Sequence, residues 1–458
     1  MANSTDSLQR GLNTDSNSRY SVHFDITVNI FELDNMVVNP PNRCSKCSRC
    51  HCVSEEGVNL SCKELEEKLL LEKSVTVENG KTSVVLPFIR SPDILQDNRS
   101  DMIRRAEGQW KSLKKKGFLD HYNSEFRKYL NPTAISHPPV VEVSIGELDN
   151  YCGPKNYISH HHVLQPEKPS TPVRIVSNSS QDNHGISLNQ LVAKGPNLLS
   201  NLYKLLIRFR FFEVGVGLDI AKAYHTLHFD EVAKFLHLMI WKFEEDEPWR
   251  TFAYVVVPFG GVSAAGQSEC AKKRATIARE ILDDPRACEI IENELYVDDG
   301  ATGGTIEEVD RLVGVKDPIT GLYTGTLQQI LSIGGFKIKE FMISGRRSDE
   351  SKKLLGDGIL GYQWESSVDI MAVRLKANLS KSNKKVHRYP DFTLDDLPRL
   401  RNVKLTKRKL LMLIGSIYDP FSILSPFTVK LKISMGELTA VCPNQTWDTT
   451  IPDNFNQE

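Results

Sequence analysis

Hydrophobic and polar positions along this chain follow two spacings, one typical of helices and one typical of strands. Helical spacing is clear at Ile103, Ala106, Trp110 and Leu113. Similar stretches predict helices over residues 64–72, 102–116, 118–130, 271–282, 306–313 and 326–333. Apolar runs bounded by turn residues predict strands over residues 75–77, 84–86, 171–176, 235–241 and 254–258. Asn79-Gly80 separates the first two strands and is typical of a hairpin turn.

The length and charge of the chain limit its architecture and its partners. With 458 residues it is long enough for about two to four subdomains around more than one core. Its formal net charge of −1 gives no attraction to nucleic acid over the whole surface, so such a surface requires local patterning. No apolar run reaches membrane-spanning length, and no charged and then apolar signal segment is visible.

The first 21 residues contain almost nothing that would form a core, and short apolar stretches between Phe24 and Val38 are compatible with one or two strands. Residues 1–40 are expected to be mostly disordered or linker, because residues 1–21 are rich in Ser, Asn and Asp. Residues 41–62 are a Cys-rich segment in which four thiols stand close together: Cys44, Cys47, Cys50 and Cys52. Four thiols are a ligand set for tetrahedral zinc, but their spacing is not that of a standard finger. Zinc binding and metal-free loop thiols therefore both stay open.

Two further features concern metals and redox compartment. Five of the nine cysteines lie between Cys44 and Cys62 and the rest are scattered, which favours a reducing compartment over a disulfide framework. The run His160-His161-His162 is not expected to bind one ion, because successive residues of an extended segment point to opposite sides.

A candidate hairpin at residues 294–300 brings two carboxylates together. Tyr296 and Val297 are interpreted as the end of a short strand. Gly300, with Gly303-Gly304 beyond it, is expected to supply a tight return and to leave Asp298 and Asp299 side by side at the tip. Adjacent carboxylates repel each other unless a positive charge lies between them. Taken alone, the pair is therefore either an exposed, solvated turn or a site for a divalent cation.

A second segment favours the cation site over the exposed turn. Residues 212–218 alternate between apolar and other positions up to Asp219, which predicts a half-buried strand that ends at a carboxylate. A helix-compatible run with Tyr224 follows. Three carboxylates from two neighbouring strands are able to bridge two Mg²⁺ ions about 4 Å apart, which clamp the attacking and leaving oxygens in nucleotidyl transfer.

With these two segments, the sequence resembles the reverse transcriptases of BEL/Pao-type LTR retrotransposons, collinearly from about residue 39 to residue 451. The resemblance implies an α+β, right-hand polymerase with fingers, a palm built on an antiparallel sheet, and a thumb, preceded by the Cys-rich segment. It implies these boundaries: 63–150 for an N-terminal extension, 151–211 for fingers, 212–345 for palm, and 346–458 for the primer-side hairpin, the thumb and the start of the connection.

The resemblance also implies residues that bind the incoming dNTP. In the family, an arginine at the place of Arg174 contacts the triphosphate, for which a guanidinium offers paired donors. Lys222 lies in the turn next to the triphosphate, and Tyr224 stands where an aromatic ring excludes a 2′-hydroxyl. Phe259 and Gly260 belong to the segment that contacts nucleotide and template. From the residues alone, Arg174 remains open as an exposed strand arginine and Tyr224 as an ordinary packing residue.

The chain departs from the family at two places. A proline is usual where Ala265 stands, a departure that slightly weakens the inference of a nucleotide contact for this segment. Glu340-Phe341 replaces a Lys-Trp ending. The second change leaves the lysine that protonates the leaving pyrophosphate uncertain between Lys337 and Lys339.

The C-terminal part adds the charge that the whole chain lacks. Residues 374–409 contain twelve Lys or Arg against three Asp, which predicts a surface that tracks a nucleic-acid backbone or, alternatively, a solvated basic face. Residues 359–364 resemble the primer-side hairpin of the family, and residues 406–426 resemble its thumb helix and the turn that follows. The RNase H and integrase portions of the family polyproteins are expected to be absent here.

The function implied is that of a retrotransposon RNA-directed DNA polymerase, which adds dNTPs to a primer 3′-hydroxyl. The implied catalytic and metal-binding residues are Asp219, Asp298 and Asp299, with two Mg²⁺ or Mn²⁺ ions. The implied partners are an RNA or DNA template with its primer and no membrane. The implied location is cytoplasmic, in a virus-like particle, with nuclear entry left open. The alternative is a non-catalytic, nucleic-acid-binding relic of such an element.

Overall fold

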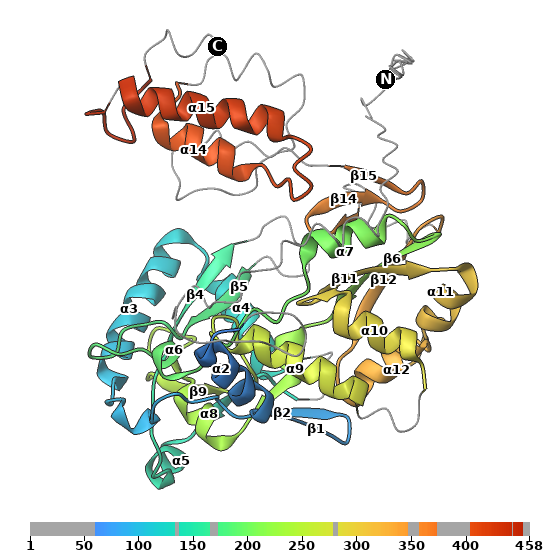
Figure 1. The fold of residues 1–458 in the computed structure, drawn as a ribbon. Coiled ribbons are helices and arrows are strands. Elements are labelled where there is room, and N and C mark those ends of the chain that lie inside the picture. Colours follow the sequence, from blue (N-terminus) through green and yellow to red (C-terminus); the bar gives the residue numbers. More distant parts are fainter. Residues whose placement is uncertain are drawn as a thin grey trace, which may run out of the picture. The chain divides into compact units, whose positions relative to one another are not determined.

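The structure is a computed structural model that describes residues 60–132, 137–164, 173–277, 283–346, 357–372, 404–441 and 443–451. The chain separates into two units, Met1–Ser61 and Cys62–Glu458, and every element named below belongs to the second. Helices and strands are mixed along it (Figure 1), so the α+β class is confirmed. The expectations for residues 1–40, for the Cys44–Cys52 cluster and for most of the basic stretch 374–409 lie outside the described residues.

A four-stranded antiparallel sheet in the order β10-β11-β6-β12 carries the candidate aspartates. Its members are β6 (Val214–Ile220), β10 (Leu295–Tyr296), β11 (Asp299–Gly304) and β12 (Ile338–Ile343). Because β6 lies between β11 and β12, it is a central strand with both edges paired.

Helices cover one face of this sheet and enclose the largest apolar core (Figure 1). They are α9 (Ala264–Ile277), α10 (Pro285–Asn293), α11 (Ile306–Val313) and α12 (Thr326–Ile333). The starts of two of them follow from local chemistry. Asp284 caps α10 in front of a proline, and Thr305 forms a capping box with Glu308 at the start of α11. The predicted bounds of α11 and α12 are confirmed residue for residue.

The other face of β6 is covered by α7 (Leu202–Phe209) and by a small sheet of β13 (Asp357–Ile359), β14 (Tyr362–Glu365) and β15 (Ile370–Ala372). Glycines on β6 allow this close approach: a Cβ on Gly217 would lie 2.8 Å from Met342 Cε and 3.4 Å from a ring carbon of Trp364. The prediction of a half-buried strand is therefore wrong, because Gly215 to Leu218 are buried on both faces.

A second group of strands and helices encloses an aromatic core. Its strands are β3 (Val140–Val143), β4 (Ser159–Leu164), β5 (Val173–Asn178), β8 (Leu238–Trp241) and β9 (Arg250–Tyr254), in the orders β3-β9-β8 and β4-β5. The helices α3 (Arg99–Lys116) and α4 (Leu119–Leu130) contribute to this core. The other helical elements in this part of the chain are η1 (Pro92–Ile94), α5 (Ile145–Asn150), α6 (Leu188–Leu191) and α8 (Glu231–Leu236). His160 lies inside this core, where its Nε2 is 3.2 Å from the carbonyl of Ile240. The buried position agrees with a structural histidine.

The first elements of the second unit pack against α9. They are α2 (Cys62–Lys73), β1 (Val75–Glu78) and β2 (Lys81–Val84), and β2 pairs in parallel with β7 (Leu227–Phe229), which follows η2 (Ala223–Thr226). The predicted hairpin is confirmed, with Asn79 and Gly80 both at positive φ as a two-residue turn requires. Gln267 of α9 donates to the Val85 carbonyl at 2.8 Å and so ties α9 to this sheet.

The last described elements are two packed helices, α14 (Lys407–Ser416) and α15 (Ser425–Val441). Between them, the Tyr418 hydroxyl donates to the Leu360 carbonyl at 2.7 Å in the β13–β14 turn. The helix and hairpin predicted for this region are thus present. None of the helices in the described part of the chain combines the length and apolar character needed to cross a bilayer.

Two local predictions are corrected. Residues 235–241 are not one strand: Phe235 and Leu236 end α8, and β8 begins at Leu238 and pairs with β9, not with the aspartate-bearing sheet. Gly300, Gly303 and Gly304 do not form the return of the hairpin, because they lie within β11. The return is the two-residue turn that precedes them.

Candidate active site at the β10–β11 hairpin

Two of the three aspartates face each other across neighbouring strands. In the β6–β11 register Asp299 lies directly opposite Asp219. Directly opposed residues of an antiparallel pair have their side chains on one face, with Cβ atoms about 5 Å apart. Asp298 occupies the turn between β10 and β11, and its carbonyl accepts a hydrogen bond from the Ile220 amide at 2.7 Å. The sheet thus brings all three predicted residues to one end of β6.

The turn that carries Asp298 has an unfavourable backbone conformation. Tyr296 pairs with Asp299, so the turn consists of Val297 and Asp298 alone. Val297 has a φ of +58°. A β-branched residue in the left-handed region is strained by contact between its Cβ and the backbone, and such strain persists only where neighbouring contacts hold it.

A buried lysine reaches this turn from α9. Lys272 Nζ donates to the Val297 carbonyl at 2.7 Å and forms an ion pair with Glu269 Oε1, also at 2.7 Å. The Lys272 side chain is 0% exposed and that of Glu269 4%. Burial raises the pKa of the Glu269 carboxyl, and the neighbouring Lys272 charge opposes that rise. Sequence reasoning missed both residues.

A second lysine contacts the site from the solvent side. Lys339 Nζ lies 2.6 Å from Asp219 Oδ2, with the Lys339 side chain 60% exposed and that of Asp219 35%. Lys339 falls where the β6–β12 register shifts, and such a bulge redirects the side chain of the extra residue. The next residue, Glu340, stands opposite Asp219, so Asp299, Asp219 and Glu340 form a row of carboxylates across three strands.

The electrostatics of Asp298 reflect this crowding. Although its side chain is exposed, surrounding protein partly desolvates the carboxyl and raises its pKa. The negative charge of Asp219 adds to the rise, whereas Lys272 and Arg174 oppose it. Asp298 is therefore within electrostatic reach of cations from two other elements.

The three aspartates are suitable metal ligands by chemistry, but they are not gathered around a point. Carboxylate oxygens are the donors that Mg²⁺ prefers. In the described ranges, no three His, Cys, Asp or Glu side chains come close enough together to hold a cation. Because Lys339 is paired with Asp219, binding of a divalent ion by this set requires the Asp219 carboxylate to leave that ammonium group.

Tyr224 and Phe259 of the predicted nucleotide-binding set lie together near Asp298. The two rings are 5.2 Å apart, edge to face. Burial raises the pKa of the Tyr224 hydroxyl, and the Asp298 charge raises it further. Lys222 precedes η2 with a φ of +49°, and partial burial lowers the pKa of its exposed ammonium group, against the charge of Glu125. Tyr224 thus lies within electrostatic reach of Asp298 and also packs against the largest apolar core.

Arg174 and Gly260 are linked through β5. Arg174 is exposed on that strand, and Ser177 of the same strand donates to the Phe259 carbonyl at 2.6 Å. Gly260 has a φ of +115°, and a Cβ there would lie 2.5 Å from the Ser177 carbonyl oxygen. Glycine is therefore required where the Phe259–Gly260 turn meets β5.

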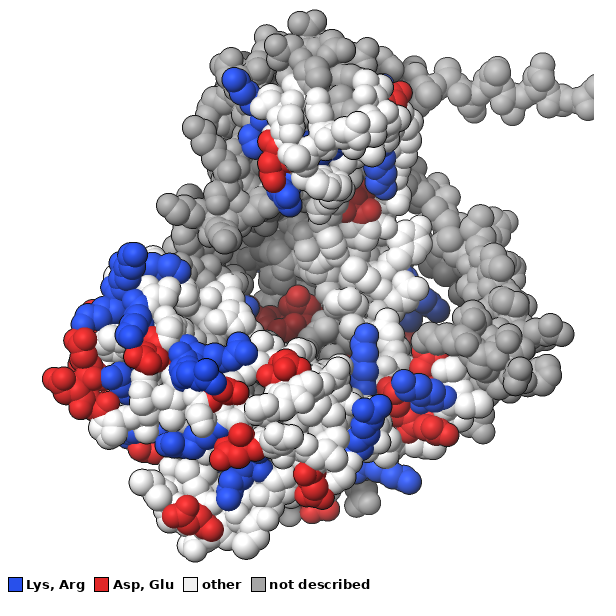
Figure 2. Space-filling view, turned by 90° about the vertical axis from the view of Figure 1, so that its left-hand side faces the viewer, with Lys and Arg blue, Asp and Glu red and all other residues white. Residues whose placement is uncertain are grey.

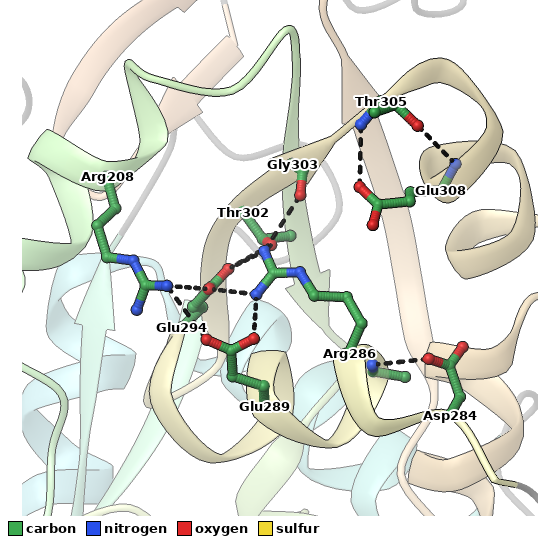
Figure 3. A network of polar contacts seen from close by, with 10 residues as sticks. Arg208, Asp284, Arg286, Glu289, Glu294, Thr302, Gly303, Thr305 and Glu308 are labelled. Atoms are coloured by element: carbon green, nitrogen blue, oxygen red, sulfur yellow. Dashed lines mark hydrogen bonds and ion pairs between the residues drawn. The ribbon is translucent and has the colours of Figure 1, made fainter.

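The base of the hairpin is held by a separate polar network (Figure 3). Arg286 of α10 contacts buried Glu294 at 2.7 and 3.1 Å and donates to the Gly303 carbonyl at 3.2 Å. Arg208 of α7 reaches Glu289 at 3.1 Å in the same network. These contacts join both strands of the hairpin to the helices around it. The i, i+3 spacing of Arg286 and Glu289 is a sequence signal for pairing, but the buried partner Glu294 is not.

One face of the molecule has charge of both signs near a recess. Figure 2 shows acidic side chains inside the recess and Lys and Arg side chains gathered on the surface beside it. Such a distribution supplies local positive surface even in a chain of net charge −1.

Comparisons with known proteins give one sequence match and several distant structural ones. Residues 406–458 match the family model described as "Pao retrotransposon-like RNaseH-like domain". This match corrects the expectation that the chain contains no counterpart of an RNase H portion. No curated protein matches the sequence.

Two of the similar solved structures are foamy viral. The foamy viral protease-reverse transcriptase dRH in complex with double-stranded DNA is 10% identical, with a TM-score of 0.39, over 70% of this chain and 44% of that one. The foamy viral protease-reverse transcriptase with an RNA/DNA hybrid is 11% identical, with a TM-score of 0.34, over 65% and 31%. The chain thus spans less than half the length of either protein. Its sequence relation to retroelement Pol proteins is carried by residues 406–458.

Proposed function

We propose that this chain is an RNA-directed DNA polymerase of a retrotransposon, which adds dNTPs to the 3′-hydroxyl of a primer on a template. The observation that carries the proposal is the placement of Asp219, Asp298 and Asp299 at one end of β6, next to Tyr224 and within the field of Arg174. The Pao family match at residues 406–458 supports the retroelement origin.

Each of these residues has a distinct role in the proposed reaction. Arg174 offers paired N–H donors to triphosphate oxygens. Tyr224, held edge to face against Phe259, excludes a 2′-hydroxyl by occupying its space. When bound, two Mg²⁺ or Mn²⁺ ions on Asp219, Asp298 and Asp299 would neutralise charge on the reacting oxygens. Catalysis of this kind rests mainly on positioning and charge neutralisation, so the rigidity of the hairpin matters as much as its carboxylates.

The proposal includes a right-hand arrangement. It assigns fingers to residues 151–211, where the β4–β5 pair carries Arg174, and palm to residues 212–345, where the aspartate-bearing sheet lies. It assigns the primer-side hairpin, the thumb and the start of the connection to residues 346–458, where Tyr418 joins the β13–β14 turn. The last part of this range, residues 406–458, also matches the RNaseH-like family model. Template and primer would contact the basic stretch 374–409 through their phosphates.

A second candidate is a non-catalytic nucleic-acid-binding relic. The ion pair between Lys339 and Asp219 favours it, because a protein cation then occupies a carboxylate that the reaction requires. Glu340 also favours the relic, because it adds a further carboxylate to the row across the sheet.

Primer extension by the full chain separates the two candidates. The substrates are an RNA template with a DNA primer, the four dNTPs, and Mg²⁺ or Mn²⁺, and the control is Asp298→Asn. Extension that disappears in the control is expected. Salt-sensitive binding of template–primer without extension, under either ion, would refute the polymerase and favour the relic.

A further inference from the structure

We propose that Lys272 is a positioning residue that, together with Glu269, holds the Val297–Asp298 turn in its strained conformation and thereby fixes the Asp298 carboxylate. This inference deepens the proposed polymerase function and rests on it for its kinetic consequences. The claim that Lys272 holds the turn does not depend on the proposed function, because the contact between α9 and the turn exists whether or not the chain polymerises DNA.

The ion pair itself does not explain why a lysine is buried at this position. Glu269 and Lys272 lie one turn apart on the same helix, so their contact joins no two elements. Removing an ammonium group from water is costly, and apolar residues often replace buried ion pairs without loss of stability. What a lysine adds here is a charged donor that leaves the helix and reaches the Val297 carbonyl at 2.7 Å.

The turn needs such a donor. Val297 has a φ of +58°, which a β-branched residue adopts only when other contacts compensate. A charge-assisted hydrogen bond is about twice as strong as a neutral one and comparable with that strain. The next carbonyl, that of Asp298, accepts from the Ile220 amide. The carbonyl groups of both turn residues are therefore bonded, that of Val297 to Lys272 of α9 and that of Asp298 to Ile220 of β6.

Lys272 also brings a positive charge to the turn, because its ammonium group is fully buried at the Val297 carbonyl. Glu269 balances it, since an unpaired ammonium would otherwise be buried. The pair therefore supplies a cation that solvent does not reach, in contrast to exposed Lys339.

The hairpin has a second anchor that serves as a matched control. Arg286 and Glu294 form an ion pair at the base of the hairpin, in which the Glu294 side chain is 2% exposed and that of Arg286 18%. Substitution there removes a pair with an equally buried carboxylate and a less buried cation, while leaving the bonds to Val297 and Asp298 in place.

The experiment compares two double variants of the full chain, Lys272→Met/Glu269→Gln and Arg286→Met/Glu294→Gln. Each removes both charges, so neither leaves an unpaired buried charge. Hydrogen exchange is followed by mass spectrometry in peptides covering residues 217–222 and 294–304. We expect exchange at the Ile220 amide and the turn to increase at least about tenfold in the Lys272 variant only. Exchange in that variant as slow as in the unmodified chain would overturn the proposal.

Primer extension adds a kinetic readout. The Lys272 variant is expected to lose about 10- to 100-fold in kcat, normalised to folded protein, with template–primer affinity unchanged, because small displacements of a reacting group have effects of this size. The control variant is expected to lose less of its normalised kcat than the Lys272 variant, because both bonds to the turn remain in place. An unchanged normalised kcat in the Lys272 variant would overturn the positioning role. Absence of extension by the unmodified chain would instead refute the proposed function, and hydrogen exchange alone would then decide the role of Lys272.

Discussion

Acidification is expected to destabilise the fold through His237, a buried histidine at the C-terminal end of α8. Its side chain is 1% exposed, its Nδ1 lies 2.8 Å from the Ala233 carbonyl, and its ring stacks on Phe229 at 4.6 Å. Desolvation lowers the pKa of His237 from 6.5 to about 4, although the hydrogen bond to Ala233 opposes the shift. The folded protein therefore favours the neutral ring.

The sign and size of the effect follow from this shift. Because the folded pKa is below the unfolded one, the contribution of His237 is fully present above pH 6.5 and is lost as the pH falls toward about 4. Between about pH 7.5 and about pH 5 the loss is about 2 kcal/mol. His160 and His225 are also buried with a pKa of about 4, so the sum approaches about 6 kcal/mol, a large part of a typical domain stability.

Urea unfolding at the two pH values isolates His237. The free energy of unfolding is compared for the unmodified chain, for His237→Gln, and for His121→Gln, which alters an exposed histidine of α4. Between the two pH values the His237 variant is expected to lose about 2 kcal/mol less than the unmodified chain, and the His121 variant is expected to lose as much. An equal loss in all three proteins would refute a shifted His237.

Two further predictions concern the candidate site. Gly303→Ala is expected to cost about 3 kcal/mol in unfolding free energy, because its Cβ would collide with the Val214 carbonyl oxygen, which cannot rotate away. Gly358→Ala, whose Cβ has ordinary contacts, is the control, and equal melting temperatures would contradict the packing argument. Lys339→Met is expected to lower the dissociation constant of Mn²⁺ by about 2- to 5-fold, since an exposed ion pair is worth up to about 1 kcal/mol. Calorimetric titration measures it, and unchanged or weaker binding would show that the pair does not compete with the ion.

Local elements could be predicted where local chemistry decides them. The bounds of α11 follow from apolar spacing and from the Thr305–Glu308 capping box. The β1–β2 hairpin follows from Asn79-Gly80. The failures share a different cause. The burial of Gly215 to Leu218 on both faces depends on α7 and β14, whose packing on β6 is tertiary, and alternation along one strand does not reveal it.

The sequence indicates the three carboxylates that the structure brings to one end of β6, but not the contacts of Lys272 with the turn and of Lys339 with Asp219. Asp219, Asp298 and Asp299 lie at or just after the ends of apolar runs, and this pattern can be recognised from the sequence alone. Lys272 stands in the run Lys272-Lys273-Arg274, which looks like a solvated helix face, and only the packing of α9 buries it. Lys339 is one of the two lysines that the resemblance suggests for protonating the leaving pyrophosphate. Its contact with Asp219 arises from a register shift that sequence spacing does not encode.

The two lysines near the hairpin, Lys272 and Lys339, differ in how readily a metal ion could displace them. Asp299, Asp219 and Glu340 place like charges side by side on adjacent strands. Such a row is unfavourable unless nearby cations offset the repulsion. Lys272 is fully buried and bonded to the turn, so no solute displaces it without local unfolding. Lys339 is largely exposed, and its pair with Asp219 is correspondingly weak. A divalent ion entering from solvent would therefore replace Lys339 and leave Lys272 in place. On the proposed function, Lys339 neutralises the Asp219 charge until an ion binds, and Lys272 holds the turn that carries Asp298.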